Sequence, residues 1–183
     1  ELYLRYPELD LYIRNMCDPG DTPGLRLHSA RSFKADLAFP GADQFNKDLQ
    51  TWNGKGFNET PDEWLTRHNI NVIIGFFGFS ESLKGPTGVD DFKSELDGFV
   101  KHTLAQKYDG EVSPQLALVS PVAFEDLSQG HDFPDGKAEN ENLALYAEAI
   151  RAVASANNVI FVDAIQSSKE WYASTDMPLT IDG

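Results

Sequence analysis

Short apolar runs alternate along this chain with segments whose apolar residues recur at helical spacing. The clearest run covers residues 71–77 and ends abruptly in small and polar residues at 78–82. A short apolar run that a turn signal closes predicts a strand buried on both faces. Similar patterns, rich in strand-forming residues, predict further strands over residues 10–16, 115–120 and 158–163.

The predicted helices lie between these strands. Thr60, Pro61 and Glu63 form a good helix start, with an N-cap, a proline at the first helical position and a capping box. Apolar residues at helical spacing predict longer helices over residues 90 to about 109 and 140 to about 156, with a helix tail within 2–9 and a short helix around 169–172. This alternation predicts an α/β fold with a parallel sheet and helices on both faces.

Right-handed crossovers place the carboxyl ends of parallel strands at one edge of the sheet. Three polar segments follow predicted strands at that edge, namely residues 18–21, 78–82 and 121–125. Ligands of open α/β sheets bind beyond such strand ends. We therefore expect the functional site among these three segments.

One long segment, residues 25–59, shows little periodicity and holds several aromatic residues among glycines and polar residues. Irregular segments of this length within a compact domain are often functional loops. The alternative is a surface excursion that packs its own aromatic side chains. A loop over the site could hold a sugar ligand, because aromatic faces pack against sugar rings.

Composition narrows the functional classes. The 183 residues suffice for one domain, 1–183, and 41% hydrophobic and 24% charged residues are ordinary for a globular chain. A formal net charge of −14 disfavours nucleic acid and anionic membrane surfaces as partners. No apolar run is long enough to span a bilayer, and Cys17 is the single cysteine, so no internal disulfide can form.

Three short motifs occur in order along the chain, the first two at the ends of predicted strands. Arg14-Asn15 with Gly20-Asp21-Thr22 resembles the second conserved block of the SGNH, or GDSL, hydrolases. Gly78-Phe79-Ser80-Glu81 resembles their third block, which is usually Gly-x-Asn-Asp, and Thr180-Ile181-Asp182-Gly183 resembles the start of their last block. The SGNH-like domains of large multidomain bacterial proteins, some of which carry c-type haem modules, are the most similar in pattern.

This resemblance implies a flavodoxin-like three-layer α/β/α fold and ester hydrolysis, often of acetylated carbohydrate, without a cofactor. It places Gly20 and Ser80 in the oxyanion hole and makes Asp182 the residue that orients the catalytic histidine. Asn15, Asp21 and Glu81 would support these residues. The expected partner is a small-molecule or carbohydrate ester, and the family's location would be periplasmic or secreted.

The chain departs from the family pattern at several points. The first block, with its nucleophilic serine, and the histidine three positions after Asp182 are not among these residues. We therefore expect a fragment of a longer polypeptide, whose missing first strand would lie between the second and third strands of the sheet. Ser80 stands where the family has Asn, and loss of a good oxyanion donor costs on the order of 3 kcal/mol in transition-state stabilisation.

Two other interpretations remain open. Residues 78–82 approximate a Gly-x-Ser-x-Gly nucleophile elbow around Ser80, which would need Asp126 or Asp163 with His131 as partners, but the residues after it predict a loop and not a helix. The chain could also be a catalytically degenerate domain that binds carbohydrate or takes part in assembly of a larger protein. Glu81 is either a general base or, more simply, a carboxylate that holds the turn through backbone amides. The His, Cys, Asp and Glu residues show no metal-ligand spacing.

Overall fold

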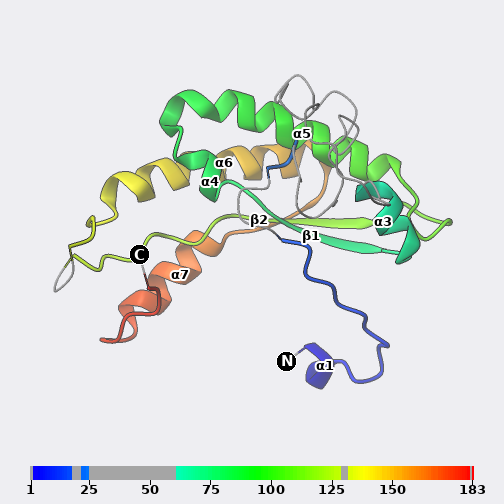
Figure 1. The fold of residues 1–183 in the computed structure, drawn as a ribbon, viewed down its shortest axis with the longest axis horizontal. Coiled ribbons are helices and arrows are strands. Elements are labelled where there is room, and N and C mark those ends of the chain that lie inside the picture. Colours follow the sequence, from blue (N-terminus) through cyan, green and yellow to red (C-terminus); the bar gives the residue numbers. More distant parts are fainter. Residues whose placement is uncertain (1, 18–21, 25–60, 129–131, 182) are drawn as a thin grey trace, which may run out of the picture.

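The fold contains a small parallel sheet, as the alternation of strands and helices predicts. A computed structural model describes residues 2–17, 22–24, 61–128, 132–181 and 183. Within these residues, three strands pair in parallel in the order β1-β2-β3 (Figure 1). The strands are β1 (Val72–Phe76), β2 (Gln115–Val119) and β3 (Ile160–Val162).

Helices precede or follow each strand, and two long ones cover one face of the sheet. The helices are α1 (Leu2–Arg5), α3 (Pro61–Arg67), α4 (Phe79–Ser82), the 3₁₀ turn η3 (Gly85–Gly88), α5 (Val89–Ala105), α6 (Lys137–Asn157) and α7 (Ala164–Ala173). Figure 1 shows α5 and α6 side by side on one face of the sheet, and α7 on the opposite side. None of the described helices is long and apolar enough to cross a membrane.

The core lies between the sheet and the α5–α6 pair. Leu118 of β2, Leu96 and Val100 of α5, and Tyr146 and Ile150 of α6 are almost completely buried there. Burial of each such side chain stabilises the fold by about 1.5–3 kcal/mol. The residues that carry the helical and strand periodicity of the sequence are therefore the residues that pack this layer.

Helices lie on both sides of the sheet, as predicted, but the face on the side of α7 is only partly covered (Figure 1). Val72, Ile74 and Phe76 of β1 are 55%, 53% and 58% exposed, and Ile160 and Val162 of β3 are 61% and 46% exposed. We call these five side chains the open face. Parallel sheets are normally covered on both sides. The described helices cover only one face fully, because α7 leaves the open-face side chains half exposed.

The strand predicted over residues 10–16 is wrong, because the structure gives this segment no regular secondary structure. A strand needs a neighbour for its backbone groups, and the described part of the sheet contains only β1, β2 and β3. Instead, the Tyr12 ring stacks on His68 with 6.2 Å between ring centroids. The other predicted elements are present with shifted ends: α6 begins at Lys137, and α7 begins at Ala164 after the N-cap Asp163.

Candidate functional site

The turn after β1 lies at the carboxyl edge of the sheet, where the sequence places the site. Figure 1 shows α4, the chain that follows β2, and the C-terminus at this same end of the sheet. Glu81 is 5% exposed, and its Oε2 accepts a hydrogen bond of 2.9 Å from the backbone N–H of Gly78. This contact confirms the prediction that Glu81 holds the turn through a backbone amide.

Gly78 allows the chain to turn sharply from β1 into α4. Its φ of 103° lies in the left-handed region that favours glycine. A Cβ on Gly78 would lie 3.2 Å from Ile150 Cδ1 and 3.3 Å from Pro121 Cγ. The turn is therefore packed directly against α6 and against the end of β2.

Ser80, the predicted oxyanion donor, lies in the single helical turn of α4. Its side chain is exposed, and its hydroxyl joins none of the hydrogen bonds among the described residues. A hydroxyl in this state can donate one hydrogen bond to a ligand at the sheet edge. The loop expected after Ser80 is instead this helical turn followed by η3.

A second buried glutamate anchors the segment that follows the predicted second block. Glu95 of α5 is 8% exposed, and its Oε1 accepts hydrogen bonds from Thr22 Oγ1 at 2.8 Å and from the Gly24 N–H at 2.7 Å. Gly20 and Asp21 themselves lie outside the described residues. The described segment from Thr22 to Gly24, which follows them in the sequence, is held against α5.

A third buried glutamate anchors the residues just before Asp182. Glu125, which is 7% exposed, follows β2, and its Oε2 accepts hydrogen bonds of 2.7 Å from both the N–H and the hydroxyl of Thr180. The Leu179 N–H donates to the two Glu125 oxygens at 3.1 and 3.0 Å. Asp182 lies outside the described residues, but Thr180, two positions earlier, is held at the end of β2.

Serine hydroxyls link the ends of β2 and β3. Ser120 Oγ accepts a hydrogen bond of 2.8 Å from the Ala164 N–H and donates one of 3.0 Å to the Pro121 carbonyl. Ser168 Oγ of α7 accepts a hydrogen bond of 2.8 Å from the Ala123 N–H. These buried contacts fix the chain between β2 and Glu125, and so they fix the carboxylate that holds Thr180.

The three glutamates differ in their proton affinity. Burial raises the pKa of Glu81 above its ordinary 4.5, the Gly78 N–H opposes this rise, and the charge of Glu95 adds to it. Burial also raises the pKa of Glu95, against the hydrogen bonds from Thr22 and Gly24. Burial pushes the pKa of Glu125 upward as well, but the hydrogen bonds from Thr180 and Leu179 outweigh it, so its pKa is lowered.

Sequence reasoning found Glu81 and placed Glu125 in the candidate segment 121–125 without a role, but it missed Glu95. The available signal for Glu95 was its position next to Leu96 on the apolar face of a predicted helix, where a charged residue requires a partner. Asn15, expected as a supporting residue, is exposed, and its Oδ1 accepts a hydrogen bond of 2.9 Å from the Cys17 N–H within its own turn. Its role in the site stays a prediction.

The structure counts against Ser80 as the nucleophile of an elbow. Such a serine sits at a sharp, strained turn, whereas the described non-glycine residues with positive φ are Asn69 and Asn158 and do not include Ser80. The proposed acid partners have other bonds: Asp126 accepts from Ser128, and Asp163 caps α7 and bonds to Arg151 at 2.7 Å. His131 lies outside the described residues, as does the irregular segment 25–59.

The two described histidines lie away from this edge. His102 Nε2 lies 2.7 Å from Asp62 Oδ2 near the end of α5, and His68 packs against Tyr12 and Trp64. His68 directly follows α3, and His102 lies in the last turn of α5. In the described part of the chain, no cluster of three or more His, Cys, Asp or Glu side chains could hold a metal ion.

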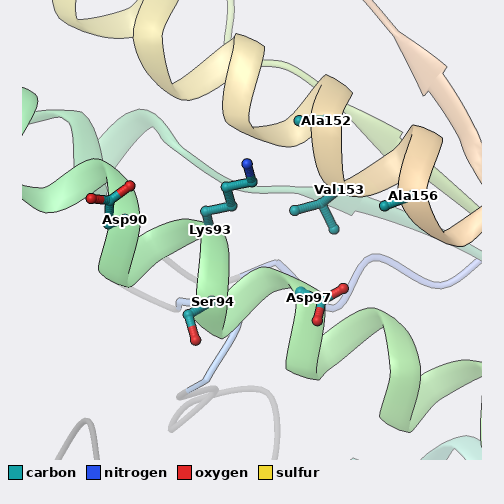
Figure 2. A pocket seen from close by; sticks show the side chains of 7 residues that line it. All are labelled: Asp90, Lys93, Ser94, Asp97, Ala152, Val153 and Ala156. Atoms are coloured by element: carbon teal, nitrogen blue, oxygen red, sulfur yellow. The ribbon is translucent and has the colours of Figure 1, made fainter.

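A shallow pocket of about 350 Å³ lies between the outer faces of α5 and α6 (Figure 2). Figure 2 shows Lys93 between the two helices, with Asp90 and Asp97 on α5 and Val153 on α6. The predicted site residues do not line this pocket. It is a groove between two solvated helix faces, and the candidate site remains the sheet edge.

Comparisons with protein-family models, with curated proteins and with solved structures gave no match. The functional conclusion therefore rests on the residues and the geometry of this chain.

Proposed function

We propose that this chain is part of an SGNH-type serine ester hydrolase that acts on an acylated, most simply acetylated, carbohydrate. The observation that supports this most is the use of three buried glutamates at three turns. Glu95, Glu81 and Glu125 each accept hydrogen bonds from backbone amides in or beside the segments that carry Gly20, Ser80 and Asp182. Buried carboxylates that fix the backbone in this way can hold hydrogen-bond donors in place before a reaction begins, which preorganised catalysis requires.

In the proposed site, the Gly20 N–H and the Ser80 hydroxyl donate hydrogen bonds to the oxyanion that forms when a serine attacks the ester carbonyl. Asp182 orients the histidine that takes the serine proton and passes it to the leaving alcohol. The serine and the histidine come from residues of the polypeptide outside 1–183. Ser80 is a weaker donor than the amide it replaces, because its hydroxyl rotates freely, so we expect slow turnover.

The open face supports a site that further residues complete. The five apolar side chains of the open face are each about half exposed, and such a patch marks an interaction surface. Among the described residues, β1 pairs only with β2, so its other edge can accept a strand. A strand and a helix from elsewhere in the polypeptide would cover the open face and bring the nucleophile to the site.

Substitution of Ser80 in the full-length polypeptide tests this function. With an aryl acetate as substrate, we expect Ser80→Asn to raise kcat by about tenfold to a hundredfold and Ser80→Ala to lower it, because only an oxyanion donor stabilises the transition state selectively. Ser94→Asn, on the exposed surface of α5, is the matched control. Equal turnover in all three variants would show that Ser80 does not contact the oxyanion.

A second candidate is a catalytically degenerate domain of the same fold that binds carbohydrate. The serine in place of the amide donor at position 80 favours it. This candidate predicts that the full-length polypeptide binds acetylated oligosaccharide without turning it over, and that Ser80→Asn leaves it inactive.

A further inference from the structure

Glu95 occupies an unusual position for an acidic residue. It lies in the middle of α5, next to fully buried Leu96, and is itself 8% exposed. A buried carboxylate is costly unless hydrogen bonds compensate it. Its described partners come from residues more than 70 positions earlier, Thr22 and Gly24, and not from a neighbouring turn of its own helix.

The segment from Thr22 to Gly24 fits closely against this carboxylate. Pro23 is fully buried, and a Cβ on Gly24 would overlap the Glu95 side chain, with Cδ and Cγ 2.7 and 2.8 Å away. The Gly24 N–H and the Thr22 hydroxyl point at the same oxygen. Only glycine at position 24 allows the backbone to approach this closely.

Glu95 also lies near the turn that carries Ser80. Its charge contributes to the raised pKa of Glu81, and Lys84 acts on both carboxylates in the opposite direction. Asp91 raises the pKa of Glu95 further. The turn before α4 and the segment from Thr22 to Gly24 are therefore each held by a carboxylate, and the charge of Glu95 acts on Glu81.

We infer that Glu95 is a positioning residue, which holds the segment from Thr22 to Gly24 against α5, near the turn that carries Ser80. The inference rests on the proposed function for the role of Gly20 and Ser80. The anchoring itself depends only on the contacts of Glu95. It assigns to a residue of the core helix the task of holding the residues that follow Gly20 in the sequence.

Hydrogen exchange of the full-length polypeptide tests the anchor. We expect Glu95→Ala to speed exchange in a peptide that contains Thr22 and Gly24 by about tenfold to a hundredfold, since two hydrogen bonds to a charged group are lost. Glu95→Gln should restore most of the protection, because its amide oxygen can accept both bonds. Asp90→Ala, an exposed acid at the start of the same helix, is the matched control and should change nothing.

Turnover of an aryl acetate by the same variants gives the second readout. Positioning predicts that Glu95→Ala lowers kcat with little change in KM, and that Glu95→Gln rescues kcat. A folded Glu95→Ala protein whose Gly24 amide stays protected would overturn the inference, whether or not the protein is an esterase. If Glu95→Ala does not fold, Thr22→Val removes one of the two bonds and should give a smaller increase in exchange. Faster exchange in a protein without esterase activity would support the anchor and reject the proposed function.

Discussion

Substitution of Glu125 by Ala should release the residues that precede Asp182. The Glu125 carboxylate accepts hydrogen bonds from three donors, the Thr180 N–H, the Thr180 hydroxyl and the Leu179 N–H. A hydrogen bond contributes about 1 kcal/mol net of the bond to water that it replaces, and we take this lower figure for each donor because three donors share one carboxylate. The expected loss is about 3 kcal/mol, or about a hundredfold in the opening equilibrium of this segment.

Hydrogen exchange followed by mass spectrometry measures this loss in a peptide that covers residues 179–183. Asp126→Ala is the matched control, because Asp126 is the exposed neighbour of Glu125, and its hydrogen bonds among the described residues are with Ser128 in its own turn. Thr180→Val should give part of the effect, since it removes the hydroxyl but keeps the N–H. A folded Glu125→Ala protein that exchanges no faster than Asp126→Ala would refute the reasoning.

The pH dependence of this anchor has a definite sign. Because the folded pKa of Glu125 is lowered, its contribution to stability is present above the ordinary value of 4.5 and is lost as the pH falls through the folded pKa. The difference in stability between Glu125→Ala and the unchanged protein should therefore be constant above pH 4.5 and shrink below it.

Three further predictions concern the turn after β1 and the open face. Gly78→Ala should lower Tm by about 4–8 °C, because strain in the left-handed region and contact with Ile150 together cost about 2 kcal/mol. Gly110→Ala is the control: Gly110 has φ of 83° and open space around it, so this variant should show the effect of the strain alone. Glu81→Gln should flatten the pH dependence of stability. Because the folded pKa of Glu81 is raised, its stabilising effect is full below pH 4.5 and is lost as the pH rises through the folded pKa. If the unchanged protein and Glu81→Gln had identical denaturation midpoints across this pH range, the prediction would be contradicted. Phe76→Ser should reduce aggregation of the 183-residue chain but lower the Tm of the full-length polypeptide, and a scattering measurement with a thermal scan checks both effects.

The sequence predicts the elements that carry strong local signals. Apolar runs mark β1, β2 and β3, and helical spacing around Leu96 and Ile150 marks α5 and α6. The strand expected over residues 10–16 does not form, because strand pairing depends on a neighbour that local pattern does not reveal. The sequence does not predict the open face for the same reason, because the apolar character of Ile74 does not show which element covers it.

The candidate site divides in a similar way. Glu81 could be predicted because its partner Gly78 is three residues away. Glu95 and Glu125 act on segments 71 and 55 positions away, and nothing in the local sequence pairs them with Gly24 or Thr180. Long-range contacts of buried carboxylates are therefore the part of this site that only the fold supplies.

The central claim is that a serine outside residues 1–183 performs the chemistry and that Ser80 assists it. Labelling of the natural full-length protein with a fluorophosphonate probe, with the modified residue mapped by mass spectrometry, tests this most directly. The account predicts a single label on a serine that precedes Glu1 in the polypeptide. A label on Ser80, or no label on the folded protein, would contradict it.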